Sequence, residues 1–288
     1  MKVLITGAGG LIASHFARRL AREHDVLALK RLDLDISDRK AVRRRVADFR
    51  ADCIVNGAVV QVDAAERNPL LSEAVNRDGA RFLAEAAQEN GAEIVHFSTQ
   101  YVFDGEPTGR PPYTINDKTR PVNNYGRTKL AGEEAVRSAC SRSYVVRTSW
   151  VYGMGKDSFL CTVHADLREG KRVRVIDDIW SSTTYVEDLI DRCLEIFERR
   201  RYGTYHVVNE GICSYYEFAR EAGTLVGLTD RQMDFLLEIT HEGDMKRAAT
   251  RPRYTPLRCL LSEELFLPRM RHWKSALAAY VRSSIPSA

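Results

Sequence analysis

The sequence has no apolar run long enough to cross a membrane and no closely spaced pair of cysteines. A spanning helix needs about 20 consecutive apolar residues, and the apolar start at residues 1–6 gives way at once to a glycine loop, so no signal peptide is expected. The six cysteines are scattered singly, which predicts neither zinc nor disulfides. The seven histidines form no ligand-spaced cluster, so no metal is predicted. We expect a cytoplasmic protein with buried thiols.

Excess charge of either sign is also scarce. The chain carries 43 Lys and Arg against 39 Asp and Glu, a net charge of +4. Nucleic-acid binding usually rests on a strongly basic surface, so no nucleic-acid partner is predicted. The short basic runs at residues 43–45 and 199–201 are typical of a solvated helix face or a helix C-terminus.

Short apolar runs alternate with longer amphipathic stretches over the first half of the 288 residues. The pattern predicts strands at 3–6, 25–29, 53–55, 94–98 and 144–148, and helices at 11–22, 38–49, 70–89 and 125–140. This alternation implies right-handed βαβ units and a mostly parallel sheet, and the β-branched strands fit burial on both faces. The predicted fold class is a doubly wound α/β fold of the Rossmann type. The loop between Thr99 and Val122 is long enough to be functional.

The pattern becomes less regular after Gly153. Strands are expected at 173–176 and 205–209, and helices at 215–226, 263–266 and 272–282. We therefore predict a first domain at residues 1–152 and a smaller C-terminal lobe at residues 153–288 that would close over a ligand. Some segments of this second part are expected to return to the first domain.

A glycine-rich turn, GAGGLIA at residues 7–13, joins the first predicted strand to the first helix. Gly7 permits the tight turn, Gly10 lets the backbone approach a pyrophosphate, and Ala13 allows close helix–strand packing. The helix N-terminus offers free N–H groups and partial positive charge to phosphates. A plain turn is the alternative, but the strand–turn–helix context predicts an NAD(P)-binding domain at residues 1–152.

The end of the second predicted strand lacks the acidic residue that would bind a ribose 2′-OH. Lys30 and Arg31 stand there instead and would favour a 2′-phosphate. We predict NADPH as the cofactor, with NADH as the alternative if both side chains point into water.

Tyr125 and Lys129 lie four residues apart in a predicted helix and therefore share a face. A tyrosine with its ordinary pKa of about 10 is a poor acid or base at neutral pH, and a close ammonium would lower that pKa. Thr99 follows the strand predicted at 94–98, at the edge where ligands meet a parallel sheet. These residues predict a proton-transfer site, with a chance surface pair as the alternative.

Together these motifs resemble those of the extended short-chain dehydrogenases/reductases, and most closely those of the dTDP-4-dehydrorhamnose reductase family. The matching segments include STQYVFDG at 98–105, NYGRTKLAGE at 124–133, RTSWVYG at 147–153 and TYVEDL at 184–189. The resemblance covers most of the chain. It implies an NADPH-dependent enzyme that reduces the 4-keto group of a nucleotide-linked, dTDP-type 4-keto-6-deoxy sugar, and it also implies a homodimer.

The resemblance assigns roles to individual residues. Tyr125 would donate a proton to the sugar ketone, Lys129 would hold the nicotinamide ribose, and Thr99 would complete the catalytic triad. The cofactor would be bound by Gly7, Gly10, Leu11, Ile12, Lys30, Arg31, Asp35, Ile36, Gly57, Ala58, Val59, Tyr125 and Lys129. The substrate would contact Thr99, Gln100, Trp150 and Arg251. From the residues alone, Arg251 could pair with a diphosphate or cap the segment before it.

Two departures from the family pattern lie on the sugar side. Gln100 stands where the family usually has Asp, and residues 179–184 lack the family's Gln and Pro. They suggest a modified deoxysugar, with neutral drift as the alternative. Two other functions stay open: a nucleotide-sugar epimerase of the same fold, and a non-catalytic NADP-binding regulatory subunit resembling that of methionine adenosyltransferase.

Overall fold

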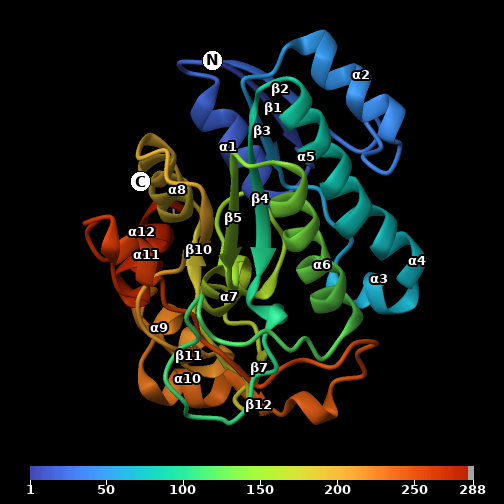
Figure 1. Cartoon of the computed structure of the whole chain (residues 1–288). Coiled ribbons are helices and arrows are strands. Elements are labelled where there is room, and N and C mark those ends of the chain that lie inside the picture. The colour runs from blue at the N-terminus through green and yellow to red at the C-terminus, as the bar shows by residue number, and fades with distance from the viewer. Residues whose placement is uncertain (285–288) are drawn as a thin grey trace.

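A six-stranded parallel sheet forms the centre of the molecule (Figure 1). The structure, a computed structural model, describes residues 1–284. The strands are β1 Lys2–Thr6, β2 Asp25–Leu29, β3 Cys53–Asn56, β4 Glu93–Thr99, β5 Ser143–Thr148 and β10 Gly203–His206, in the order β10-β5-β4-β3-β1-β2. All neighbouring pairs are parallel. The chain moves outward from β1 to β2 and then crosses back to β3, as doubly wound sheets do, so the predicted Rossmann-type fold is confirmed.

Helices cover both faces of this sheet (Figure 1). On one face lie α1 Leu11–Leu20 and α8 Val186–Glu198; on the other lie α2 Arg39–Phe49, α5 Ala80–Glu89 and α6 Asn124–Ala139. Successive side chains of a strand point to opposite faces. In β1, Val3 and Ile5 pack in the core with α1 and α8, whereas Leu4 packs in the core with α2 and α5. Burial on both faces explains why these strands are continuously apolar.

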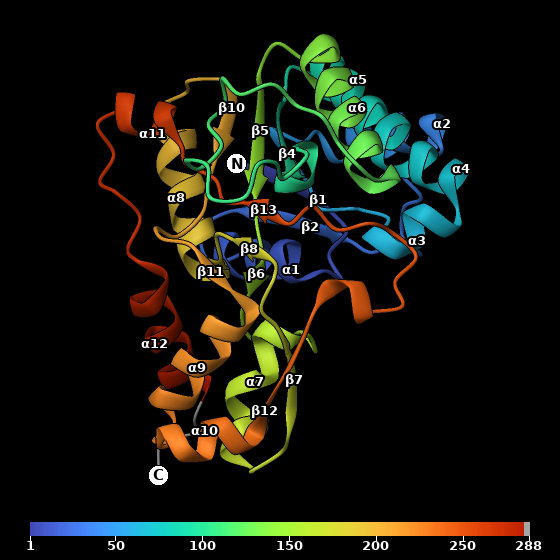
Figure 2. The same cartoon turned by 90° about the horizontal axis from the view of Figure 1, so that it is seen from below.

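Much of the chain after β5 forms a separate group of helices below the sheet (Figure 2). Its main elements are α7 Phe159–Arg168, α9 Tyr215–Leu225, α10 Asp230–Leu236 and α12 Trp273–Ser284, with the parallel pair β7 Val173–Ile176 and β12 Leu237–Thr240. The side chains of α7, α9 and α12 continue the core under α1 and α8. The lobe therefore packs against the first half of the chain on the side of α1 and α8.

The remaining elements are short connections. They are α3 Val62–Arg67, α4 Pro69–Ser72, α11 Leu260–Glu264, the π-helical η1 Glu73–Gly79, the 3₁₀ turns η2 Gln100–Val102 and η3 Glu242–Asp244, and the strands β6 Val151–Tyr152, β8 Trp180–Ser181, β9 Thr184–Tyr185, β11 Cys213–Ser214 and β13 Tyr254–Thr255. The helix predicted at 70–89 is continuous but changes to π-helical geometry within η1.

Several elements of the second half differ from the predictions, and neither α10 nor β12 was predicted. Helix α8 was not predicted, although its buried residues follow helical spacing. The strand expected at 205–209 begins earlier, at Gly203, and the helix expected at 263–266 begins at Leu260. Because β10 is a strand of the central sheet and α8 packs on that sheet beside α1, segments after residue 152 do return to the first half. The domain division itself stays a prediction, and residues 285–288 of the proposed lobe lie outside the described residues.

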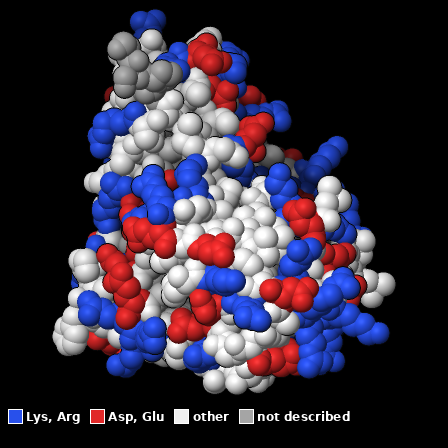
Figure 3. Space-filling model, turned by 90° about the horizontal axis from the view of Figure 1, so that it is seen from above, with Lys and Arg blue, Asp and Glu red and all other residues white. Residues whose placement is uncertain are grey.

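Charged side chains of both signs are interspersed on the face seen in Figure 3. The predicted basic runs lie where expected: residues 43–45 are exposed on α2, where Arg43 pairs with Glu89 at 2.7 Å, and residues 199–201 follow the end of α8. Within residues 1–284, no helix has both the length and the apolar character needed to cross a membrane.

Candidate active site

The glycine turn between β1 and α1 packs directly on the chain that follows β3. Gly7 has a left-handed backbone conformation with φ of +69°, and a Cβ there would lie 2.5 Å from Ala58 N. Glycine is required at this position for both reasons. Gly10 forms the N-cap of α1 and donates its N–H to Gly7 O at 2.8 Å. The N-terminus of α1 is thereby held at the carboxyl edge of the sheet.

A cavity of about 360 Å³ opens at this edge. Its wall combines residues from the glycine turn and α1, from the ends of β3, β4 and β5, from α6 and from the lobe. The lining includes most of the predicted site residues, namely Gly10, Leu11, Ile12, Gly57, Ala58, Val59, Thr99, Gln100, Tyr125, Lys129 and Trp150. Segments far apart in the sequence therefore meet where parallel sheets bind ligands.

The other predicted cofactor residues lie outside this lining. Lys30 and Arg31 are exposed in the turn after β2. The Asp35 carboxylate accepts from the Ser37 N–H and hydroxyl at 3.0 and 2.7 Å, and these bonds lower the pKa of Asp35. Ile36 is buried and packs so closely on helix η1 that a Cβ at Gly79 would lie 2.6 Å from it. Their contacts with a cofactor stay predictions.

Arg251 is engaged by a carboxylate in the first half of the chain. Its guanidinium pairs with Asp63, at the start of α3, at 2.6 Å, and donates to Ala249 O at 3.0 Å. Asp63 also accepts from Ala249 N–H at 3.1 Å. The pair ties the segment after η3 to α3, a role that neither reading of Arg251 anticipated. A contact between Arg251 and substrate stays a prediction.

The start of α6 places Tyr125 against the end of β4. Asn123 caps the helix by accepting from Gly126 N–H at 2.8 Å. A Cβ at Gly126 would lie 2.2 Å from Tyr101 O, so only glycine allows η2 to approach α6 this closely. The rings of Tyr101 and Tyr125 meet edge to face with centroids 5.6 Å apart. This approach brings Thr99, at the end of β4, next to Tyr125.

The protonation of Tyr125 differs from the prediction. Burial raises the pKa of Tyr125 to about 12, and a hydrogen bond with Thr99 opposes that rise only in part. The predicted lowering of this pKa by Lys129 is therefore wrong for the protein alone, because burial dominates and the Lys129 Nζ is bonded elsewhere, to Phe97 O at 2.6 Å. The phenol is consequently neutral at physiological pH and can serve as a proton donor.

A buried ion pair next to the cavity was not predicted. The Arg147 guanidinium on β5 donates to both carboxylate oxygens of Glu133 on α6, at 2.9 and 2.7 Å, and the Ser98 hydroxyl donates to the same carboxylate. Both charged residues are buried. Arg147 is a charged residue inside the predicted strand 144–148, and a charge in a buried strand indicates a buried partner of opposite sign. The pair fixes α6, and with it Tyr125 and Lys129, to the sheet.

An aromatic stack forms the wall of the cavity on the side of the lobe. Trp150 has a positive φ of 40° and lies over Tyr215, with ring centroids 3.9 Å apart and planes 27° apart. Phe159 contacts the edge of Tyr215 with centroids 5.4 Å apart. Tyr215, the first residue of α9, was missed because nothing near it in sequence marks a site. The stack offers a flat surface to a ring-shaped ligand.

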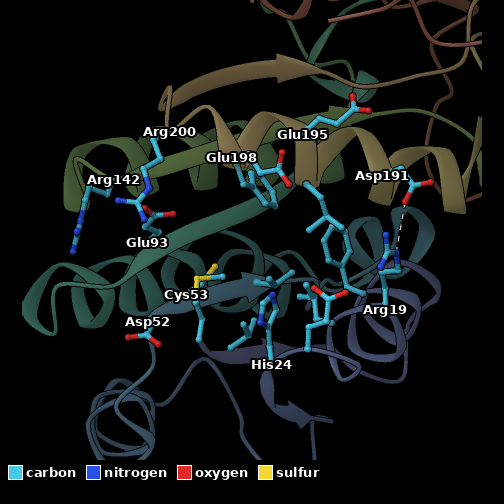
Figure 4. Close-up of a pocket in the computed structure, with 18 of the residues that line it drawn as sticks. Arg19, His24, Asp52, Cys53, Glu93, Arg142, Asp191, Glu195, Glu198 and Arg200 are labelled. Carbon is cyan, nitrogen blue, oxygen red and sulfur yellow. Dashed lines mark ion pairs between the residues drawn. The ribbon is translucent and has the colours of Figure 1, made fainter.

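A larger cavity, of about 1020 Å³, lies between α1 and α8 near the amino ends of β1, β3 and β4 (Figure 4). Phe16 and Cys53 are among the residues that line it. The ion pair Arg19–Asp191, with Nε and Oδ1 3.7 Å apart, lies at one side. Among the described residues, those lining it include none of the predicted site residues. Ligands of parallel sheets bind at the opposite, carboxyl edge, so we place the chemistry in the smaller cavity.

Asp177, Asp178 and His241 come together at the end of β7, where their ligand atoms lie within 4.8 Å of one another. This group was not predicted, because His241 is far from the two acids in the sequence. His241 Nδ1 bonds Asp177 at 2.8 Å, and Asp178 accepts from Glu242 N–H at 2.8 Å. These contacts fasten η3 to β7, which is sufficient reason for the grouping.

The sheet, the glycine turn and the Tyr125–Lys129 helix at one cavity define an extended short-chain dehydrogenase/reductase. The chain belongs to the RmlD substrate binding domain family, which matches residues 1–285. The resemblance found in the sequence is thus confirmed.

Curated relatives match nearly the whole chain. The spore coat polysaccharide biosynthesis protein SpsK of Bacillus subtilis is 36% identical over 98% of this chain and 97% of its own length. The dTDP-4-dehydrorhamnose reductase of Mycolicibacterium smegmatis is 39% identical over 96% of this chain and 84% of its own length. Among solved structures, dTDP-4-dehydrorhamnose reductase from Bacillus anthracis in complex with NADP has a TM-score of 0.91 and 31% identity, covering 98% of this chain and 99% of that one.

Proposed function

We propose that this chain is an NADPH-dependent reductase of the 4-keto group of a nucleotide-linked, dTDP-type 4-keto-6-deoxy sugar. The observation that carries the proposal is one cavity that joins the N-terminus of α1 to Thr99, Tyr125 and Lys129. Several relatives are named dTDP-4-dehydrorhamnose reductase, and one from Streptomyces niveus, 34% identical over 95% of this chain and 94% of its own length, is named dTDP-4-keto-6-deoxy-D-glucose reductase. These names agree with the predicted activity.

The residues present fit a dinucleotide. The turn at Gly7 and Gly10 leaves the first N–H groups of α1 free at the cavity wall, where a pyrophosphate would be bound. Gly57, Ala58 and Val59 line the adjacent wall, and Lys129 also lines the cavity, where it would hold the nicotinamide ribose. When bound, NADPH would supply the hydride. We assign the adenosine end to Lys30, Arg31, Asp35 and Ile36.

Tyr125 supplies the proton in this scheme. Its half-buried phenol stays protonated at neutral pH, and the oxygen of a ketone becomes a strongly basic alkoxide as it is reduced. An alkoxide is more basic than a phenolate, so proton transfer from Tyr125 is favourable even with a raised pKa. The Thr99 hydroxyl, beside the phenol, would hold the substrate oxygen in line with that proton by turning its own proton from Gln100 Oε1 to the substrate.

The sugar side of the cavity is assigned to Gln100, Trp150 and Tyr215. Gln100 is buried and its Oε1 accepts from the Thr99 hydroxyl at 2.9 Å. A neutral amide there places no charge beside the substrate, in contrast with the Asp usual in the family. Trp150 and Tyr215 offer the flat surface described above. We keep Arg251 as a further candidate contact.

Turnover tests this proposal directly. The purified chain should consume NADPH, measured by its absorbance, when given a dTDP-4-keto-6-deoxyhexose, and NMR of the product should show a new C4 hydroxyl. Cofactor binding without consumption would support the regulatory subunit instead. Interconversion of sugars without net consumption of NADPH would support an epimerase. Either result would overturn the reductase assignment.

Cofactor preference should change when the charge after β2 is removed. In the double variant Lys30→Ala with Arg31→Ala, we expect the KM for NADPH to rise by about tenfold, since each exposed contact with a 2′-phosphate contributes about 1 kcal/mol or less. The KM for NADH should stay unchanged, because NADH has no 2′-phosphate. Arg43→Ala, on exposed α2, is the matched control for loss of surface charge. Equal changes for both cofactors would contradict the assignment.

We also propose that the protein works in the cytoplasm as a homodimer, as the family resemblance implies. Light scattering coupled to gel filtration should give twice the 32.6 kDa of one chain. A mass of a single chain at the concentrations used in assays would contradict the dimer.

A further inference from the structure

A buried chain of polar side chains runs from β3 to the candidate active site. It consists of Asn56 at the end of β3, His96 in β4 and Lys129 on α6, each of them no more than 3% exposed. Asn56 Nδ2 lies 3.0 Å from His96 Nδ1, and His96 Nε2 lies 3.3 Å from Lys129 Nζ. Neither Asn56 nor His96 has a role predicted from the sequence.

The direction of these hydrogen bonds follows from a backbone group. The Ala58 N–H, which can only donate, lies 3.2 Å from Asn56 Oδ1, and the Thr6 hydroxyl donates to the same oxygen at 2.8 Å. The Asn56 amide is therefore oriented with its NH₂ toward His96. Because that NH₂ can only donate, His96 Nδ1 must accept.

The ring of His96 then carries its proton on the other nitrogen. Burial, together with the neighbouring Lys129, holds the pKa of His96 well below its ordinary value, so the ring is neutral and has a single N–H. With Nδ1 accepting from Asn56, that proton is on Nε2. The His96 N–H is consequently directed at Lys129 Nζ.

A charged Lys129 cannot accept this N–H. An ammonium has three donors and no lone pair, whereas an uncharged amine has one lone pair and two donors. The amine can accept from His96 Nε2–H and donate to Phe97 O, which lies 2.6 Å from Nζ. The contacts on both sides of Nζ thus favour the uncharged form.

Other charged groups lie around Lys129: Lys156 lines the same cavity, and Glu66 of α3 accepts from the Asn124 N–H of α6 at 2.9 Å. On α6 itself, Glu133 favours the ammonium, but its carboxylate is bound by Arg147 of β5. Tyr125 of α6 and Tyr101 of η2 are half-buried phenols whose raised pKa values keep them neutral. Where η1 and α4 pack on α6, the contacts are neutral hydrogen bonds among Ser72, Asn76 and Thr128. Burial lowers the pKa of Lys129 to about 8.

We propose that Asn56 and His96 hold Lys129 as an uncharged amine in the cofactor-free protein at mildly alkaline pH, and that dinucleotide binding places a proton on its Nζ. The proton comes from solvent. Ribose hydroxyls and phosphates brought into the cavity offer acceptors and negative charge to Nζ, which favours the ammonium. His96 is a positioning residue in this scheme, since it acts only through Lys129. The second part rests on the proposed function; the first does not.

Nitrogen NMR of the full cofactor-free chain tests the first part. In a long-range ¹H–¹⁵N spectrum, His96, identified by its loss in His96→Gln, should show its proton on Nε2. In ¹⁵N-lysine-labelled protein, the Nζ signal lost in Lys129→Met should titrate about two pH units or more below the ordinary lysine pKa of about 10.4. A proton on Nδ1, or an ammonium signal that persists above pH 9 or so, would overturn the proposal without touching the reductase assignment.

Asn56→Asp should reverse the arrangement. A carboxylate cannot donate to Nδ1 and would instead accept from it, so the proton moves to Nδ1 and Nε2 becomes an acceptor for Lys129. We expect the Lys129 midpoint to rise by about one pH unit or more. Asn76→Asp is the matched control, because it also puts a buried carboxylate next to α6 but does not contact His96. An equal rise of the Lys129 midpoint in both variants would show a simple charge effect and overturn the role of His96. If Asn56→Asp does not fold, the position of the His96 proton in the unmodified protein still tests the proposal.

Calorimetry of NADPH binding tests the second part. Measured near pH 8.5 in buffers of different ionisation enthalpy, binding should take up about one proton per chain, because Lys129 is then largely uncharged before binding. The uptake should disappear in Lys129→Met and fall in Asn56→Asp. Binding with no proton uptake would overturn this coupling and would leave the dinucleotide site itself intact.

Discussion

Tyr125→Phe is expected to lower kcat by about 10²- to 10⁴-fold, the usual contribution of a positioned general acid. The variant keeps the ring that packs edge to face on Tyr101 and removes only the hydroxyl. The Kd for NADPH should therefore change little. The measurement pairs steady-state turnover of a dTDP-4-keto-6-deoxyhexose with NADPH binding followed by fluorescence.

Tyr216→Phe is the matched control for Tyr125→Phe. Like Tyr125, Tyr216 is a half-buried tyrosine at the second position of a helix, here α9. Its hydroxyl accepts from Arg220 at 3.1 Å, and the residue is not part of the cavity lining. It should keep the turnover of the unmodified protein. Near-normal turnover in Tyr125→Phe, with Tyr216→Phe also active, would refute the role of Tyr125 as proton donor.

Arg147→Met is expected to lower the free energy of unfolding by about 3–5 kcal/mol, because it leaves the Glu133 carboxylate buried without its cation. Glu133 is 0% exposed, so the stranded charge has no access to water. Methionine keeps much of the apolar stem of arginine and isolates the loss of charge. Urea denaturation, compared at equal m-values, gives the change.

Two variants bracket this prediction. Arg137→Met removes a second arginine, 3.6 Å from the same carboxylate but 40% exposed, and should cost about 1 kcal/mol or less. Combining Arg147→Met with Glu133→Gln removes both buried charges and should recover part of the lost stability. A loss in Arg147→Met as small as that in Arg137→Met would contradict the importance of the buried pair.

The parts of the fold that were predicted are those with local causes. The strand at 25–29 and the strand at 173–176 have the bounds expected from their apolar runs. Helix α8 was missed although Val186, Leu189 and Cys193 are buried at helical spacing, since its start follows irregular short strands. Sheet order is set by packing between distant segments. The pairing of β10 with β5 therefore could not be predicted from the sequence of either strand.

The candidate site divides along the same line. Thr99, Tyr125 and Lys129 could be brought together from sequence because successive βαβ units align the carboxyl ends of their strands. Tyr215 and the Asn56–His96 contact join segments with no common motif, and only the folded chain reveals them. The pKa of Tyr125 was wrongly predicted because a sequence shows which charges are near but not how deeply a phenol is buried.

The Arg251–Asp63 pair has a consequence for protein engineering. The segment that carries Arg251 crosses from the lobe to α3 (Figure 2), and Asn123 Nδ2 also donates to Thr250 O at 2.8 Å. Chimaeras that exchange lobes between relatives to alter sugar preference would separate Arg251 from its partner if the junction followed residue 152. A chimaera would keep both contacts only if Asp63 and Asn123 were transferred together with residues 249–251, or if both parent proteins already had Asp63 and Asn123 at these positions.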